Sequence, residues 1–357
     1  MKILIIRLSS IGDCVLASPV VEALRERYPA THISWLVQPK SLTVVSGLPG
    51  LSDTLVWDDR QHPTASLLTA LGRVWRAHFD VVLDLQGTRK VGLFMLAARL
   101  SGTPRRISGT SSKPLALWCS NERAPESERL HARFFYLRRA AQLDIAPDAP
   151  ERFYPRVPVC EEHRQFARDF LAAADFHPEH RLIGFNLGAS RPQNRWPCER
   201  FARLAHALLA DDDEARIITF GAAADAPLMH AFEAAFEAQL PVRGASEWRE
   251  RVLSGVGRLN LLQLAAVTER CSAFVTADTG PMHIAAAVGA PVLALFGPAD
   301  SRLTGPVHQP GRAPIRVLAA REVTGSWPAP MEALEVDAVR REVQAIMAET
   351  ATLGVPS

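Results

Sequence analysis

Short apolar runs of β type alternate with longer amphipathic stretches along the first part of the chain. The run KILIIRL at 2–8 predicts a buried strand, and 14–28 predicts the helix that follows it. Further strands are expected at 32–37 and at 79–87, where the second runs into a glycine turn. This alternation is typical of βαβ units, which build a parallel sheet with helices on both faces.

A proline-rich segment at 144–160 interrupts the alternation, because proline blocks regular helix and central strand alike. The alternation then restarts, with strands expected at 182–188, 215–221, 272–278 and 291–297, and helices at 161–174, 198–210, 225–238, 261–270 and 282–288. An amphipathic closing helix is expected at 336–349. We therefore predict an α/β fold of two Rossmann-like, doubly wound domains facing a cleft, divided as 1–155, 156–335 and a C-terminal helix and tail, 336–357, that packs back.

The charge balance changes sign along the chain. The sequence carries 40 basic and 38 acidic residues, a net charge of +2, but the first 165 residues hold 22 basic and 16 acidic ones. A basic N-terminal half suits an anionic partner or an acidic membrane surface, although scattered arginines also form an ordinary solvated exterior. With 48% hydrophobic and 22% charged residues, the composition is that of a folded globular protein.

Cysteine usage and apolar run lengths indicate the compartment. The five cysteines form no CxxC pair, which supports neither a disulfide framework nor a zinc knuckle. The N-terminal apolar run is too short for a signal peptide, and no stretch approaches the roughly 20 apolar residues of a membrane span. We expect a cytoplasmic protein that is at most peripheral to a membrane.

The turn after the first strand, RLSSIGD at 7–13, carries candidate chemistry at a strand end. Gly12 allows a ligand to approach the backbone, Ser10 offers a hydroxyl, and Asp13 stands at the start of a helix facing the expected cleft. A carboxylate there can take a proton from an attacking hydroxyl. Alternatively, Asp13 only caps the helix, since aspartate is favoured at that position and the helix dipole stabilises its charge.

The turn VTADTGPMH at 275–283 ends another strand and opens a helix, with Pro281 expected at the first helical position. The N–H groups of such a helix start attract phosphate, Gly280 permits close approach, and Thr279 adds a donor. His283 falls in the first helical turn. The alternative is that glycine and proline only mark the end of the strand and the start of the helix, and that the histidine is a surface residue.

Two further strand ends carry polar side chains. In the segment 188–197, Ser190, Arg191 and Arg195 suit a diphosphate, because guanidinium groups match phosphate oxygens, and Pro197 is expected to begin a helix. An ordinary polar loop explains the same residues. In the segment 219–225, Asp225 follows a glycine turn and is placed for a ribose or base contact, which is a weak signal by itself.

Several function classes lack their signatures. The chain has no GxxxxGK[ST] motif, and Gly255-Val256-Gly257 lacks the third glycine of a dinucleotide fingerprint. The acidic run at 211–213 is better explained as a solvated turn than as a metal site, and no metal ligand set is visible. No nucleic-acid fold signature is found either.

In this order, the four turns resemble one family, the ADP-heptose:lipopolysaccharide heptosyltransferases of glycosyltransferase family 9, over nearly the whole chain. The most specific segments are IRLSSIGD at 6–13 and Asp278-Thr279-Gly280 with His283, followed by Phe296-Gly297-Pro298; Arg195-Trp196-Pro197 and Asp84-Leu85-Gln86-Gly87 support them. The resemblance implies a GT-B fold, with the acceptor on the N-terminal domain and the nucleotide-sugar on the C-terminal one. It also implies inverting transfer of heptose from ADP-heptose to the Kdo or heptose sugars of the lipopolysaccharide core, with no essential metal and no cofactor besides this donor.

The resemblance also implies roles for single residues. Asp13 matches the general base, Asp278, Thr279, Gly280 and His283 match the turn at the donor diphosphate, Ser190 matches a hydroxyl at the phosphates, and Asp225 and Leu259 fall near the nucleoside. The family commonly has lysine at the position of Asn194. Either Arg195 or Arg191 compensates for it, which we favour, or the donor differs from ADP-heptose, or activity is reduced.

On the acceptor side, we expect contributions from Ser10, Gly12, Arg89 and Lys90, with Arg105, Arg106 and Lys113 as further candidates, because a lipopolysaccharide core precursor is anionic and lies at the inner membrane face. Peripheral membrane contact follows from the same reasoning. The alternatives left open are the same fold with another nucleotide-sugar or acceptor, a nicotinamide oxidoreductase, and a non-enzymatic nucleotide-binding or assembly protein with a degenerate site.

Overall fold

The computed structural model describes residues 1–61, 63–126, 130–145, 150–240 and 245–352. The chain divides into two compact units, Met1–Pro158 and Val159–Ser357, so that the division falls slightly after the predicted boundary at 155. Arg156 explains the difference, because its backbone N–H donates to Ser18 Oγ at 2.8 Å and its guanidinium pairs with Glu22 at 2.8 Å. These contacts attach the segment to the first unit.

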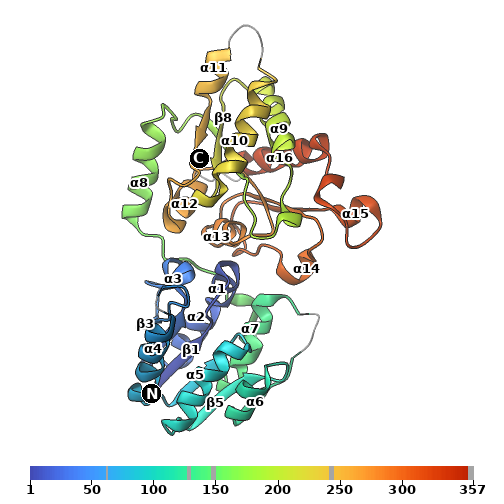
Figure 1. Ribbon diagram of the computed structural model, residues 1–357. Coiled ribbons are helices and arrows are strands. Elements are labelled where there is room, and N and C mark those ends of the chain that lie inside the picture. The colour runs from blue at the N-terminus through green and yellow to red at the C-terminus, as the bar shows by residue number, and fades with distance from the viewer. Residues whose placement is uncertain (62, 127–129, 146–149, 241–244, 353–357) are drawn as a thin grey trace. The chain divides into compact units, whose positions relative to one another are not determined.

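The first unit is built on a parallel sheet of six strands in the order β3-β2-β1-β4-β5-β6 (Figure 1). The strands are β1 (Lys2–Ile6), β2 (His32–Val37), β3 (Asp53–Val56), β4 (Val81–Asp84), β5 (Arg105–Gly109) and β6 (Glu122–Ala124). Ile3 of the central strand β1 pairs with Ile33 of β2 on one side and with Val81 of β4 on the other. Because both faces of this strand are covered by helices, its sequence is a continuous apolar run rather than an alternating one.

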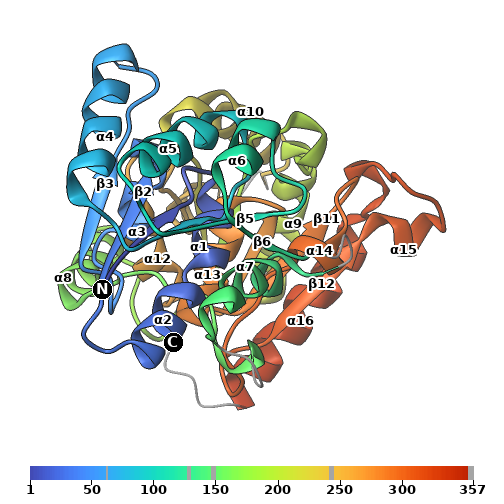
Figure 2. The ribbon, with the colours of Figure 1, turned by 90° about the horizontal axis from the view of Figure 1, so that it is seen from below.

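Helices cover both faces of this sheet. They are α1 (Ile11–Ala17), α2 (Pro19–Arg27), α3 (Pro39–Val45), α4 (Pro63–Ala77), α5 (Arg89–Leu100), α6 (Pro114–Cys119) and α7 (Ala132–Ala140), with short 3₁₀ turns at Ala141–Leu143 and Pro150–Arg152. Seen from below, α4, α5 and α6 lie in a row on one side of the strands, and α1, α2 and α7 lie on the other (Figure 2). The single helix predicted at 14–28 is wrong: it is the pair α1 and α2, because Pro19 cannot continue the first helix and instead begins the second.

The second unit repeats the architecture, with six parallel strands in the order β12-β11-β10-β7-β8-β9. The strands are β7 (Arg181–Asn186), β8 (Ala215–Phe220), β9 (Val252–Ser254), β10 (Ala273–Ala277), β11 (Val292–Phe296) and β12 (Ile315–Ala319). The helices are α8 (Glu161–Ala172), α9 (Cys198–Asp211), α10 (Ala226–Glu237), α11 (Ala245–Glu250), α12 (Leu261–Thr268), α13 (Gly280–Val288), α14 (Ser301–Thr304), α15 (Ala320–Thr324) and α16 (Val336–Thr352), with 3₁₀ turns at Pro192–Asn194, Ala223–Asp225 and Met331–Ala333.

The C-terminal helix α16 belongs to the second unit and packs against α9 and the sheet. Val339, Val343 and Ile346 are fully buried on its inner side, at the helical spacing seen in the sequence. Trp196, which precedes α9, is also buried, and its Nε1–H donates to the carbonyl of Leu334 at 2.9 Å. The Arg-Trp-Pro motif therefore ties the segment before α16 to the core of this unit.

Both sheets reverse their strand order at one point, between β1 and β4 in the first unit and between β7 and β10 in the second. Ligands of doubly wound sheets bind at the carboxyl ends of the strands beside this switch point. The turns that follow β1, β4, β7 and β10 are therefore the places where the fold favours a site.

Candidate functional site

Four adjacent strands of the second unit, β10, β7, β8 and β9, end in the turns that hold most of the residues predicted to bind the donor. Asp278, Thr279 and Gly280 follow β10, Ser190 follows β7, and Asp225 follows β8. Leu259 follows β9. Because parallel strands end at the same edge of a sheet, the fold brings these residues of distant sequence positions to one edge, with those that follow β10 and β7 at the switch point.

Asn186, the last residue of β7, joins two of these turns. Its buried Nδ2 donates to the carbonyl of Gly188 at 3.0 Å, to Thr276 Oγ1 at 3.1 Å and to Thr279 Oγ1 at 3.3 Å. Asn186 was not among the residues predicted from the sequence. Its signal was a lone amide after the apolar residues 182–185 of the strand, where a buried polar group needs hydrogen-bond partners.

Gly188, in the turn after β7, lies close to Asp225 in the turn after β8. A Cβ atom on this residue would lie 2.4 Å from Asp225 Oδ2 and 2.8 Å from its Cγ. Asp225 Oδ2 also accepts a hydrogen bond from the N–H of Ala222 at 2.9 Å, so its side chain is anchored in its own turn. Leu259 belongs to the same edge, because a Cβ on Gly255 would lie 3.2 Å from its Cδ1.

Helix α13 begins at Gly280, with Thr279 as the N-cap residue and Pro281 at the second helical position rather than the predicted first. The N–H groups of a first helical turn have no acceptors within the helix, and the helix dipole makes this end favourable for an anion. His283 lies in this turn and is only 6% exposed, so its interpretation as a surface residue is wrong.

The segment 188–197 contains both exposed residues and residues whose side chains are buried or hydrogen-bonded to the backbone. Ser190 and Arg191 are exposed, whereas Asn194 is buried within a short 3₁₀ turn. The Arg195 Nε–H donates to the carbonyl of Ala189 at 3.0 Å, so part of its guanidinium braces the loop after β7. Pro197 is the N-cap of α9 and not its first residue, which corrects the expected helix start.

In the first unit, the N-cap residue of α1 is Ser10 and not Asp13, which corrects the expected capping position. Asp13 is the third residue of the helix, and its side chain belongs to a capping box with Ser10. Its Oδ2 accepts hydrogen bonds from Ser10 Oγ at 2.7 Å and from Ser10 N–H at 3.3 Å. The same oxygen pairs with Arg7 Nη2 at 2.6 Å, and Oδ1 accepts a hydrogen bond from the Tyr136 hydroxyl at 2.6 Å. Capping and the proposed chemistry do not exclude each other, because the side chain is still 32% exposed. Gly12 is buried beside it.

The surroundings of Asp13 favour its ionised form. Burial opposes ionisation, but the Arg7 guanidinium and the hydrogen bonds from Tyr136 and Ser10 outweigh it and hold the pKa of Asp13 below the usual 3.8. Burial in turn raises the pKa of Tyr136 well above 10, so its hydroxyl remains a donor. Tyr136 was missed in the sequence, because 123 positions separate it from Asp13.

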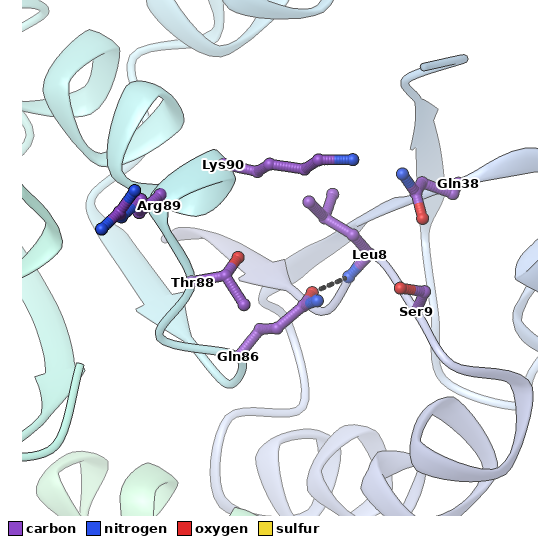
Figure 3. Close-up of a pocket in the computed structure, with 7 residues that line it drawn as sticks. All are labelled: Leu8, Ser9, Gln38, Gln86, Thr88, Arg89 and Lys90. Atoms are coloured by element: carbon purple, nitrogen blue, oxygen red, sulfur yellow. Dashed lines mark hydrogen bonds between the residues drawn. The ribbon is translucent and has the colours of Figure 1, made fainter. Parts of the chain in front are cut away.

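A pocket of about 330 Å³ opens near the switch point of the first unit, between β1 and β4. It is lined by Leu8, Ser9, Gln38, Gln86, Thr88, Arg89 and Lys90 (Figure 3). Lys90 extends over Leu8 toward the side of Gln38, whereas Arg89 turns away from the centre. The ammonium of Lys90 also pairs with Asp59 at 2.5 Å. The fold thus brings Arg89 and Lys90 to one pocket, while Ser10 and Gly12 lie with Asp13 and do not line it.

The shape of this pocket depends on the turn after β4. Asp84 Oδ1 accepts hydrogen bonds from the N–H groups of Gln86 at 2.8 Å and Gly87 at 2.7 Å, and Gln86 Oε1 accepts one from the N–H of Leu8 at 2.8 Å. The segment 84–87 therefore fixes the pocket wall to the end of β1. Arg105, in contrast, pairs with Glu122 at 2.7 Å, on a neighbouring strand.

The described residues lack two kinds of feature. They contain no helix long and apolar enough to cross a membrane. Within the same ranges, no group of three or more histidine, cysteine, aspartate or glutamate side chains is arranged to hold a metal ion. In the acidic run at 211–213, Asp212 pairs with Arg181 and Asp211 with Arg340.

Comparison with solved structures assigns the fold to a class. The crystal structure of the glycosyl transferase family 9 protein from Veillonella parvula has a TM-score of 0.82 at 23% identity, with 98% of this chain and 97% of that chain covered. The structure of E. coli ADP-heptose lps heptosyltransferase II has a TM-score of 0.78 at 23% identity, with coverages of 98% and 100%. Two Rossmann-like units with this strand order form the GT-B fold, which these structures share.

Sequence comparison then gives the family. Residues 68–314 match the profile of glycosyltransferase family 9 (heptosyltransferase), and since this is more than half of the chain, the chain belongs to that family. Among its curated relatives, the lipooligosaccharide heptosyltransferase 2 of Haemophilus influenzae is 26% identical over 318 residues, which cover 86% of each chain. The resemblance seen in the sequence motifs is confirmed.

Proposed function

We propose that this glycosyltransferase transfers heptose from ADP-heptose to the Kdo or heptose sugars of the lipopolysaccharide inner core, with inversion at the anomeric carbon. The observation that carries the proposal is the set of polar turns at both switch points in a chain that belongs to the heptosyltransferase family. The E. coli neighbour of the same fold is an ADP-heptose lps heptosyltransferase, which supports this donor and this class of acceptor.

In the proposed reaction, the acceptor hydroxyl oxygen attacks the anomeric carbon as the bond from that carbon to the diphosphate oxygen breaks. The hydroxyl proton passes to Asp13, and ADP leaves with the electrons of the broken bond. Among the described residues, Oδ2 of Asp13 accepts hydrogen bonds from three donor groups, whereas Oδ1 accepts one, from the Tyr136 hydroxyl. Since each carboxylate oxygen offers about two lone pairs, Oδ1 is the atom we assign to receive the proton.

The lowered pKa of Asp13 has a consequence for the timing of proton transfer. The carboxylate is ionised at neutral pH, as a base must be, but it is a weak base. It therefore takes the proton as the new glycosidic bond forms, when the hydroxyl becomes acidic, and not beforehand.

On the donor side, we assign the diphosphate to the first turn of α13, with Asp278, Thr279, Gly280 and His283. Backbone N–H groups and the dipole of a helix end stabilise the charge that develops on departing ADP. We assign Ser190, Arg191 and Arg195 to the phosphates, with the guanidinium groups supplying the charge that Asn194 lacks. Asp225 and Leu259 are assigned to the nucleoside.

The acceptor is proposed to bind at the pocket next to β1 and β4. Arg89 and Lys90 supply positive charge for the carboxylates and phosphates of the core, and Ser10 and Gly12 border the attacking hydroxyl through their positions beside Asp13. Because such an acceptor is built on a lipid anchor, we propose that the reaction takes place at the cytoplasmic face of the inner membrane.

A direct test is ADP release from ADP-heptose in the presence of a heptose-deficient Kdo-lipid A acceptor, with wild type and Asp13→Asn side by side. Loss of a general base is expected to lower kcat by about 10²–10⁴-fold. Donor affinity, measured by calorimetry with ADP, is expected to remain unchanged. Release by both proteins at similar rates would exclude Asp13 as the base, and NMR of the product reports whether the anomeric configuration inverts.

Asn194 is buried at the position where the family commonly has lysine, and it supports one alternative, in which the same fold uses another nucleotide-sugar. A panel of ADP-, UDP- and GDP-linked sugars with the same acceptor distinguishes the two. Turnover with ADP-heptose alone supports the proposal, and turnover with a different donor alone replaces it.

A further inference from the structure

Large apolar side chains are exposed on three neighbouring helices of the first unit. Leu68 and Trp75 of α4, Leu93 and Leu100 of α5, and Trp118 of α6 are between 37% and 69% exposed. In the part of the chain that the structure describes, these are five of the nine exposed large hydrophobic residues. Scattered single residues of this kind are normal, but a cluster on one face indicates an interaction surface.

The geometry of the helices puts these side chains on a common surface, which we call the α4–α6 face. Leu68 and Trp75 are seven residues apart, as are Leu93 and Leu100, so each pair projects from one side of its helix. Helix α5 packs between α4 and α6, in a row on one side of the sheet (Figures 1 and 2). The Arg99 guanidinium lies 4.1 Å from the Trp118 ring centroid, which joins the outer sides of α5 and α6.

The charge on this face has one sign. Helices α4, α5 and α6 contain Arg73, Arg76, Arg89, Lys90 and Arg99 but no aspartate or glutamate, although the whole chain has nearly as many acidic as basic residues. Lys90 is paired with Asp59, so the positive charge of these helices that we consider is that of the arginines. A helix surface that only faces water normally mixes both signs, as α8 does with its three acidic and two arginine side chains. The α4–α6 face therefore combines exposed tryptophan and leucine with unbalanced positive charge.

We propose that the α4–α6 face docks on the surface of an anionic lipid bilayer. Tryptophan side chains favour the boundary between headgroups and acyl chains, leucine side chains insert just below it, and arginines reach the lipid phosphates from the same helices. Charge complementarity selects an anionic surface, because a second copy of this face would present like charges to it.

The face begins close to the proposed acceptor pocket. Arg89 and Lys90, in the first turn of α5, line the pocket, and Leu93 follows one turn later on the exposed side. The 12 residues of α5 extend about 18 Å from the pocket edge to Leu100. Docking along this helix would hold the pocket at the membrane surface, where the sugars of a lipid-anchored acceptor project. Only this last step rests on the proposed function.

The test is binding of the full-length protein to vesicles, with no donor or acceptor present, so that its failure would leave the proposed transferase activity untouched. Vesicles of phosphatidylcholine with 30% phosphatidylglycerol are compared with phosphatidylcholine alone by co-sedimentation. Wild type is expected to bind the anionic vesicles, and salt is expected to weaken this binding because it screens exposed charges. Binding of neither vesicle, or equal binding of both, would overturn the proposal.

Two variants probe the face. Arg73→Glu/Arg76→Glu is expected to weaken partitioning by roughly thirtyfold or more, since each basic residue near an anionic surface contributes about 1 kcal/mol. Its matched control is Arg203→Glu/Arg341→Glu, which changes the net charge equally at two exposed arginines of the second unit. If the control weakens binding as much, net charge and not the α4–α6 face is responsible.

Trp75→Ser/Trp118→Ser tests the apolar part and is compared with Trp327→Ser, which removes a tryptophan that is 62% exposed on the second unit. The double variant is expected to lose binding and the blue shift of tryptophan fluorescence, and the control is expected to retain both. Thermal unfolding checks that the double variant is folded. If it binds vesicles like wild type but abolishes a dimer seen by sedimentation, the face is an interface between copies, which contradicts the proposal.

Discussion

A methyl group on Gly188 would lie 2.4 Å from Asp225 Oδ2, and this distance makes Gly188→Ala an informative perturbation of the donor edge. Real contacts of carbon with oxygen need about 1 Å more. Asp225 has a short side chain that is held by the N–H of Ala222 at 2.9 Å, so it can move away only by breaking that hydrogen bond. The substitution therefore either strains the turn after β7 or displaces Asp225.

Overpacking of this kind costs about 1–3 kcal/mol in unfolding free energy. For a unit of this size, each kcal/mol lowers the Tm by about 2–4 °C. Because the displaced residue is assigned to the nucleoside, the affinity for ADP is also expected to fall by roughly tenfold, the loss of one good hydrogen bond. Thermal unfolding and calorimetry with ADP measure the two effects.

A double-mutant cycle with Asp225→Ala isolates the cause. Alanine at 225 removes the clashing atoms, so Gly188→Ala is expected to cost less than about 0.5 kcal/mol in that background, while ADP affinity stays low. Gly72→Ala in α4 is the control, because the nearest described atom to its Cβ would be at the flexible end of Arg76, 3.6 Å away. Equal destabilisation by Gly188→Ala in both backgrounds would refute the proposed contact, and unchanged ADP affinity would refute the role of Asp225.

Three further outcomes are expected. Arg195→Ala weakens ADP-heptose binding more than Asn194→Ala, because Arg195 carries charge and braces the loop after β7 through the carbonyl of Ala189; equal affinities in a titration would contradict this. Tyr136→Phe removes a hydrogen-bond donor that lowers the pKa of Asp13, so the pKa of this carboxyl is expected to rise. The acid limb of the kcat–pH profile, where activity falls as the carboxylate is protonated, then moves to higher pH. An acid limb that does not move would exclude this coupling. Lys90→Ala raises the KM for the acceptor roughly tenfold and leaves the KM for the donor unchanged. The acceptor KM of the wild type rises with salt, and an acceptor KM that stays constant up to about 0.3 M salt would count against a charged acceptor site.

The local pattern of the chain was sufficient for the architecture. The apolar run at 2–8, the proline-rich segment at 144–160 and the valine and isoleucine spacing of the last helix led to two doubly wound sheets and a closing helix. Short edge strands such as Val252–Ser254 were not predicted, because three residues carry too little periodicity to be distinguished from a loop. The motifs at 6–13 and 278–283 led to the family.

Contacts between side chains that are far apart in the sequence could only come from the tertiary structure. Tyr136 meets Asp13 across 123 positions, and Asn186 meets Thr279 across 93, since sheet order and not sequence distance decides which strand ends are neighbours. The α4–α6 face is likewise invisible in any one helix. Sequence by itself determines elements and motifs because hydrophobic periodicity, capping and turn chemistry are local, whereas hydrogen-bond partners, burial and surface clusters depend on how the elements pack.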